Sequence, residues 1–253
     1  MALGDPKPTI LLVHGTWHPP KFYKQQLDLL EANGFPTSCP LQPSVGKLPP
    51  IGLKEDAQAI RDELTGLVDQ DKEVIIVAHS YGGVVSSEAI DESFGKKARA
   101  AQGKAGGVIQ ILFIAGWIVP LGLSLGSMLG SPDALPPFIP TDEEGMCMMS
   151  DAENRFYNDL PVDQQKHWAE QLVKCPAIAQ LTPLTYVAYA HHPCTYLFCE
   201  KDQGIPLFLQ EKMIDTAEET YGVTFKRERC SSGHSPFLSQ PETMLRVIEK
   251  IVA

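Results

Sequence analysis

Residues 74–83 read Val-Ile-Ile-Val-Ala-His-Ser-Tyr-Gly-Gly and join an apolar run to a serine and two glycines. The run predicts a strand buried on both faces, and residues 84–90 predict a helix. A serine on the sharp turn between such a strand and a helix is raised above the sheet, and small residues are required two positions before and after it. Ala78 and Gly82 meet that requirement. The stretch therefore predicts a nucleophile elbow with Ser80 as the nucleophile.

Strand and helix signals alternate outward from this stretch. Short apolar runs predict further buried strands at 9–13, 108–115 and 194–199, and polar alternation predicts an edge strand at 223–228. Apolar residues at helical spacing predict helices at 23–30, 57–68, 84–90 and 244–251. Alternation of this kind is typical of an α/β fold with a mainly parallel sheet, here of about six strands, and helices on both faces.

Residues 120–193 interrupt the alternation. Nine of the chain's 21 prolines and four of its seven methionines lie there, together with short helical patches such as 164–173 and no strand signal. The segment is too long for a simple loop, and its aromatic residues argue against a disordered linker. We therefore expect an inserted, mostly helical cap at 120–193 on a core made of residues 1–119 and 194–253.

Composition narrows the classes of function. The 253 residues carry a formal net charge of −10 and no basic run, which disfavours nucleic acids and membrane surfaces as partners and favours a small molecule. Polar residues interrupt the longest apolar stretch, 108–125, so we expect no membrane span. The first residues lack a secretory pattern, so a cytoplasmic location is expected. A monomer and a homodimer both fit the sequence.

The cysteines argue for a reduced protein that needs no cofactor. No pair has CxxC spacing, and no histidine stands at metal-ligand spacing from a cysteine, so we expect free and mostly buried thiols, no metal and no cofactor. The six positions are 39, 147, 175, 194, 199 and 230.

A nucleophilic serine needs a base and a carboxylate that orients the base. In the elbow architecture both follow the serine, each in the loop after a core strand. The strand at 194–199 leads to Glu200 and Asp202, and we choose Asp202 because it lies farther past the strand beside a glycine-containing turn. His234 follows the last strand and is the expected base. Packing or surface roles are expected for His79, whose side chain should point away from the serine hydroxyl, and for His167, His191 and His192.

Two backbone N–H groups are expected to stabilise a developing oxyanion. The Tyr81 amide lies at a helix N-terminus, and Gly15 allows a turn that leaves the Thr16 amide opposite it. The substrate pocket should have apolar walls from core and cap. The candidates are Trp17, Trp117 and Phe237 in the core, and Phe138, Met146, Met148, Met149 and Trp168 in the cap.

These motifs resemble those of the α/β-hydrolase superfamily. They are Leu-Leu-Val-His-Gly-Thr-Trp (11–17), Ala-His-Ser-Tyr-Gly-Gly (78–83), Cys-Glu-Lys-Asp-Gln-Gly-Ile-Pro (199–206) and Ser-Gly-His (232–234). With no hairpin before its first strand, the chain is similar to the compact plant methylesterase and hydroxynitrile-lyase branch and its fungal and bacterial relatives. The resemblance covers 8–253, with the cap matched in position and size. It implies a catalytic triad made of Ser80, Asp202 and His234. It also implies an oxyanion hole made of the N–H groups of Thr16 and Tyr81.

The resemblance favours ester chemistry over cyanohydrin cleavage. Lyases of that branch have a threonine where this chain has Gly15, and a lysine where it has Ser235. The sequence therefore predicts a serine hydrolase that cleaves a moderately apolar carboxylic ester, lactone or thioester through an acyl-enzyme. A second hypothesis is a lyase or cyclase of secondary metabolism that uses the triad for acid–base chemistry. A ligand receptor that kept the fold is a third, less favoured because all three triad positions survive.

Overall fold

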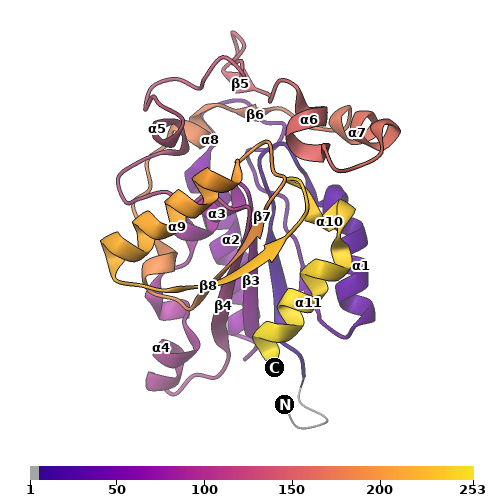
Figure 1. The fold of residues 1–253 in the computed structure, drawn as a ribbon. Coiled ribbons are helices and arrows are strands. Elements are labelled where there is room, and N and C mark those ends of the chain that lie inside the picture. The colour runs from indigo at the N-terminus through magenta and orange to yellow at the C-terminus, as the bar shows by residue number, and fades with distance from the viewer. Residues whose placement is uncertain (1–5) are drawn as a thin grey trace.

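A computed structural model describes residues 6–253 and contains a six-stranded sheet (Figure 1). The strand order is β2-β1-β3-β4-β7-β8, and every neighbouring pair is parallel. The predicted α/β fold is confirmed, with the polar strand β8 at one edge. The strands are β1 (Thr9–Val13), β2 (Thr37–Ser38), β3 (Glu73–His79), β4 (Gly107–Ile114), β7 (Cys194–Cys199) and β8 (Phe225–Cys230).

Alternate side chains of each strand enter two apolar clusters, one on each face of the sheet. In β1, Leu11 and Val13 pack on one face, while Ile10 and Leu12 pack on the other. Helices α2 (Leu53–Val68), α3 (Gly82–Ala89) and α9 (Leu207–Tyr221) cover the first face. Helices α1 (Lys24–Ala32) and α11 (Pro241–Val252) cover the second. The expected helices on both faces are confirmed, whereas α9 and α4 (Lys96–Ala101) were not predicted.

Most of the segment 120–193 lies above the carboxyl ends of the strands, and its last residues run along the first face of the sheet to the start of β7 (Figure 1). It contains α5 (Leu125–Met128), α6 (Ala152–Tyr157), α7 (Val162–Ala169), α8 (Ile178–Leu181) and the 3-10 turn η3 (Ala188–Ala190). It also contains an antiparallel pair, β5 (Met146–Cys147) with β6 (Cys175–Pro176), although no strand was expected there. Strands of two residues are too short to show alternation in a sequence. The remaining short elements are η1 (Pro20–Tyr23), η2 (Glu92–Phe94) and α10 (Pro236–Ser239).

The buried apolar residues of 120–193 belong to the same two clusters as the sheet. Leu125 and Leu184 join the first face, and Phe156 and Tyr157 join the second. The segment therefore shares its core with the sheet, and we keep its designation as a cap, with the boundaries 120–193, as a proposal.

Two features bear on the environment of the chain. All six cysteines are free, and Cys39 alone of them is not fully buried. Between residues 6 and 253, no helix is both long and apolar enough to cross a membrane.

Candidate active site

Ser80 occupies a sharp turn between β3 and α3. Its φ of +53° is in the left-handed region, which residues other than glycine rarely adopt. The two glycines that follow are required by close backbone contacts. A Cβ on Gly82 would lie 2.0 Å from the Val13 carbonyl oxygen, and one on Gly83 would lie 2.5 Å from the Trp117 carbonyl oxygen. The serine thus has the strained backbone and tight surroundings expected of a nucleophile elbow.

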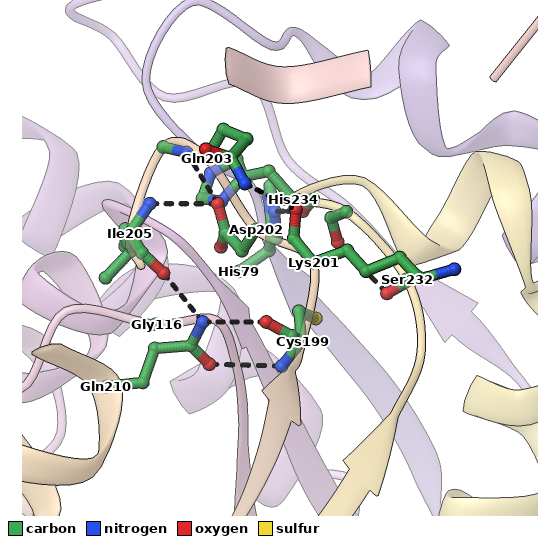
Figure 2. A network of polar contacts seen from close by, with 12 residues as sticks. His79, Gly116, Cys199, Lys201, Asp202, Gln203, Ile205, Gln210, Ser232 and His234 are labelled. Carbon is green, nitrogen blue, oxygen red and sulfur yellow. Dashed lines mark hydrogen bonds and ion pairs between the residues drawn. The ribbon is translucent and has the colours of Figure 1, made fainter. Parts of the chain in front are cut away.

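A buried histidine and carboxylate stand in the loops after β8 and β7. His234 Nδ1 lies 2.7 Å from Asp202 Oδ2, and neither residue is more than 2% exposed (Figure 2). The other carboxylate oxygen, Oδ1, accepts the N–H groups of Gly204 at 2.7 Å and Ile205 at 2.9 Å. These two backbone N–H groups fix the orientation of the Asp202 carboxylate independently of its contact with the imidazole. Glu200 instead points to the exposed Arg229 guanidinium, 3.8 Å away.

The tautomer of His234 follows from this contact. An ionised carboxylate only accepts hydrogen bonds, so Nδ1 of a neutral His234 carries the proton and Nε2 is bare. Nε2 is buried and has no hydrogen-bond partner among residues 6–253. His234 and Ser80 line the same cavity, together with Thr16. A bare ring nitrogen in the same cavity as a serine is what a general base requires before a substrate brings the two groups into hydrogen-bond contact.

The cavity is small and mostly apolar, with Thr16, Ser80, Gln180 and His234 as the polar residues of its lining. Its volume of about 30 Å³ holds roughly one water molecule. Trp17, Trp117 and Phe138 line it as expected, with Met149 among the cap methionines. The sequence analysis missed the other lining residues, which lie in loops and short helices where no periodic signal exists: Leu125, Leu129, Ile139, Phe156, Gln180, Gly204 and Ile205.

Several of the expected wall residues lie outside this lining. The Phe237 ring packs 4.2 Å from that of Tyr23, between core elements. Trp168 contacts the Phe22 ring at 5.2 Å and faces a separate surface hollow. Met146 and Met148 are also absent from the lining. Sequence identifies apolar residues, but the direction in which each side chain points depends on how the cap packs.

The loop that carries Thr16 is held by a buried, neutral histidine. His18 Nδ1 donates to the Thr16 carbonyl oxygen at 2.7 Å, so His18 Nε2 accepts from the Tyr157 hydroxyl at 2.9 Å. Burial lowers the pKa of His18 to about 3 and keeps this tautomer uncharged. Within residues 6–253, neither the Thr16 nor the Tyr81 N–H donates to another protein group. Both N–H groups thus lack a protein acceptor, and Thr16, but not Tyr81, is among the residues that line the cavity.

The side chain of Tyr81 connects the elbow to α2 and to the cap. Its hydroxyl lies 3.2 Å from Asp56 Oδ2 and 3.1 Å from the Ala179 carbonyl oxygen. Asp56 also accepts the N–H and the hydroxyl of Ser44, at 2.8 and 2.7 Å. Burial is the main cause that raises the pKa of Asp56 to about 6. Nothing in the sequence marked Asp56, because its partners are distant in the chain.

The cap also binds the loops that carry Asp202 and His234. The Asn158 side chain donates to the Lys201 carbonyl oxygen at 2.8 Å, and the Gly233 N–H donates to Asp159 Oδ2 at 2.8 Å. In the described part of the chain, no group of three or more histidine, cysteine or acidic side chains is placed to hold a metal ion.

Comparison with known proteins agrees with the fold. The model of the alpha/beta hydrolase family matches residues 10–247, and the chain belongs to this family. The alpha/beta hydrolase nvfD of Aspergillus novofumigatus is 30% identical over 249 residues, which cover 96% of this chain and 95% of that protein. The expected family is confirmed, and its named hydrolase relatives support an enzyme.

Solved structures show the same fold at low sequence identity. A pyrethroid hydrolase of Sphingobium faniae is 19% identical with a TM-score of 0.70, and the match covers 96% of each chain. A methylesterase of Arabidopsis is 18% identical with a TM-score of 0.68, and the match covers 97% of this chain and 99% of that one. The fold thus extends to a plant methylesterase, as the resemblance implied.

Proposed function

We propose that the protein is a serine hydrolase of a moderately apolar carboxylic ester, lactone or thioester. The observation that carries the proposal is the position of the His234 imidazole. Its Nδ1 is bound to the buried Asp202 carboxylate, and its bare Nε2 belongs to the same cavity as Ser80. Histidine in that tautomer takes a proton from a serine hydroxyl while the carboxylate stabilises the resulting cation.

The proposed reaction has two halves. Ser80 Oγ attacks the carbonyl carbon as its proton passes to His234 Nε2, and the N–H groups of Thr16 and Tyr81 bind the oxyanion. Collapse of this intermediate breaks the bond to the leaving oxygen or sulfur, which receives the proton from His234. Water then attacks the acyl-enzyme with His234 again as the base, which releases the acid and restores Ser80.

The lining of the cavity supports a neutral, apolar acyl group. Among the residues that line the cavity there is no Asp, Glu, Lys or Arg. Gln180 supplies an amide side chain to the lining. A charged substrate would lose its hydration there without an opposite charge in return. We further propose a cytoplasmic location, which six free thiols support because reduced cysteines persist in the cytosol.

A fluorophosphonate probe and intact-protein mass spectrometry test the function. The probe should add to Ser80, and 4-nitrophenyl esters of increasing chain length should give a transient acyl adduct at the same residue. Ser80→Ala is the control and should show neither adduct. Absence of probe labelling on the folded wild-type protein would refute the proposal. Turnover of an added substrate by Ser80→Ala would instead indicate chemistry without an acyl-enzyme.

A further inference from the structure

We propose that His79, the residue before the nucleophile, is a positioning residue that fixes His234 relative to Ser80 and to the oxyanion loop. This inference rests on the proposed function. It concerns a side chain for which the sequence indicated only packing. The proposal is carried by a continuous chain of buried hydrogen bonds through His79, which joins three of the loops that converge on the cavity.

The chain of hydrogen bonds begins at the turn after β1. The Gly15 N–H donates to the Tyr23 hydroxyl oxygen at 3.0 Å, and that oxygen lies 2.7 Å from His79 Nδ1. On the other side of the ring, His79 Nε2 lies 2.8 Å from the backbone carbonyl oxygen of His234. Tyr23, His79 and His234 are each at most 1% exposed. Figure 2 shows His79 within the cluster that contains Asp202 and His234.

Each bond in this chain has a single possible direction. A carbonyl oxygen only accepts, so His79 Nε2 carries the proton and donates to His234. Burial holds the pKa of His79 well below its usual value, so the ring is neutral and its Nδ1 is bare. Nδ1 therefore accepts the Tyr23 O–H. Since the chain ends on a carbonyl group, it carries no proton to the active site, and its effect is to hold geometry.

The packing around His79 leaves the ring one position. A Cβ on Gly15 would lie 3.1 Å from His79 Nδ1 and 3.1 Å from Ser80 Cβ, so the oxyanion loop lies directly against both residues. The His234 and Phe237 rings lie 4.8 and 5.0 Å from the His79 ring. Because the packing is close, the orientation of the His79 ring determines where the His234 backbone lies relative to the sheet.

In the proposed reaction, this network affects the relative positions of the nucleophile, the oxyanion donors and the base. Ser80 follows His79 directly, Thr16 follows Gly15, and His234 supplies the accepting carbonyl. A displacement of His234 by about 1 Å lowers rates by roughly 100-fold when proton transfer depends on alignment. The His79 ring thus sets the relation between nucleophile, oxyanion donors and base without contacting a substrate.

Three variants test the role. His79→Phe keeps a ring but removes both hydrogen bonds, and it should lower the rate of fluorophosphonate labelling and the kcat for 4-nitrophenyl esters by about 10- to 100-fold with little change in KM. His79→Gln keeps a donor that reaches the His234 carbonyl and should restore most of the rate. Tyr23→Phe combined with His79→Phe should cost less than the product of the two single losses, because both substitutions break the same chain.

A pH profile separates positioning from general destabilisation. In His79→Phe the acid limb of the labelling rate should move to lower pH, because a displaced imidazole loses part of its contact with Asp202. His192→Phe is the matched control. His192 is buried and its Nε2 donates to the Asp91 carbonyl oxygen at 3.0 Å, but it precedes β7 at the opposite end of the sheet. This variant should lose stability and keep the wild-type rate and profile.

The outcomes distinguish this inference from the proposed function. If the wild type is labelled at Ser80 and folded His79→Phe is labelled at the same rate with the same pH profile, the inference is wrong while the function stands. Lack of labelling in the wild type would refute the function. In that case, unchanged His234 ring resonances between wild type and His79→Phe in NMR titration would refute the inference as well.

Discussion

The sheet and the cap share two apolar clusters but are built from elements of different length. Every residue of β1 and of β7 is buried, and alternate side chains fill the clusters on the two faces. The elements of the cap are two to eight residues long, and polar contacts such as Trp17 Nε1 to the Cys147 carbonyl oxygen, at 3.0 Å, attach them. Long buried strands thus fix where Ser80 and His234 stand, while short elements that share the apolar clusters of the sheet and make additional polar contacts form the cap. We expect changes in the sheet loops to alter chemistry and changes in the cap to alter substrate choice.

The largest effect should come from the residues mounted on the sheet. Ser80→Ala and His234→Ala should each lower esterase kcat by about 10⁴- to 10⁶-fold, and the double variant should be little worse because the residues act as a unit. Steady-state kinetics with a chromogenic ester measures this. Losses that add in the double variant would contradict a shared catalytic step.

The two acids after β7 provide a sharper comparison within the core. Asp202→Asn should lower kcat by roughly 10⁴-fold, because an amide in place of the carboxylate favours the wrong imidazole tautomer. Glu200→Gln is the matched control, since Glu200 is exposed and faces Arg229. The Glu200→Gln variant should change kcat less than twofold, because an exposed ion pair contributes little free energy. The reverse order would show that the wrong acid was chosen.

Acid should lower the free energy of unfolding of the protein. Burial lowers the pKa of His14 to about 4 and that of His18 to about 3. Below pH 6.5 the unfolded chain therefore binds protons that the folded chain does not, and each histidine lowers the free energy of unfolding by about 1.4 kcal/mol per pH unit down to its folded pKa. Urea unfolding between pH 7.5 and 5 measures the slope. His18→Gln should reduce the slope by one histidine's share, and an unchanged slope would contradict a neutral His18.

The smallest effect should be on substrate choice. Phe138→Ala enlarges the cavity and should shift the ratio of kcat/KM between long and short 4-nitrophenyl esters by about tenfold. Trp168→Ala is the control, because Trp168 belongs to the cap but contacts Phe22 outside the cavity. That variant should leave the ratio unchanged. A larger change for Trp168 than for Phe138 would overturn the described lining of the cavity.

The sequence predicts those parts of the fold and of the candidate site that depend on residues close together in the chain or on the order of the strands. The strand before Ser80 and the glycines after it lie within ten residues, and a parallel sheet brings the ends of β7 and β8 to the same edge, so Asp202 and His234 could be proposed from chain order. Helix α9 was missed because its apolar stripe is weak between polar residues. The hydrogen bonds of His79 join residues 56 and 155 positions apart, which no local pattern encodes. The contacts between the cap and the loops of the sheet could not be predicted for the same reason.

The small volume of the cavity has a kinetic consequence. At about 30 Å³ it is roughly a tenth of the smallest usual ligand pocket, so no ester of ordinary size fits in the described arrangement. Phe138, Met149 and Leu129 belong to the cap, and they must move before any substrate reaches Ser80. The serine stands on the sheet, but Asn158 and Asp159 of the cap hydrogen-bond the loops that carry Asp202 and His234, so that movement is coupled to these loops. The frequency with which the cap opens therefore sets an upper limit on turnover that is independent of the reactivity of the ester.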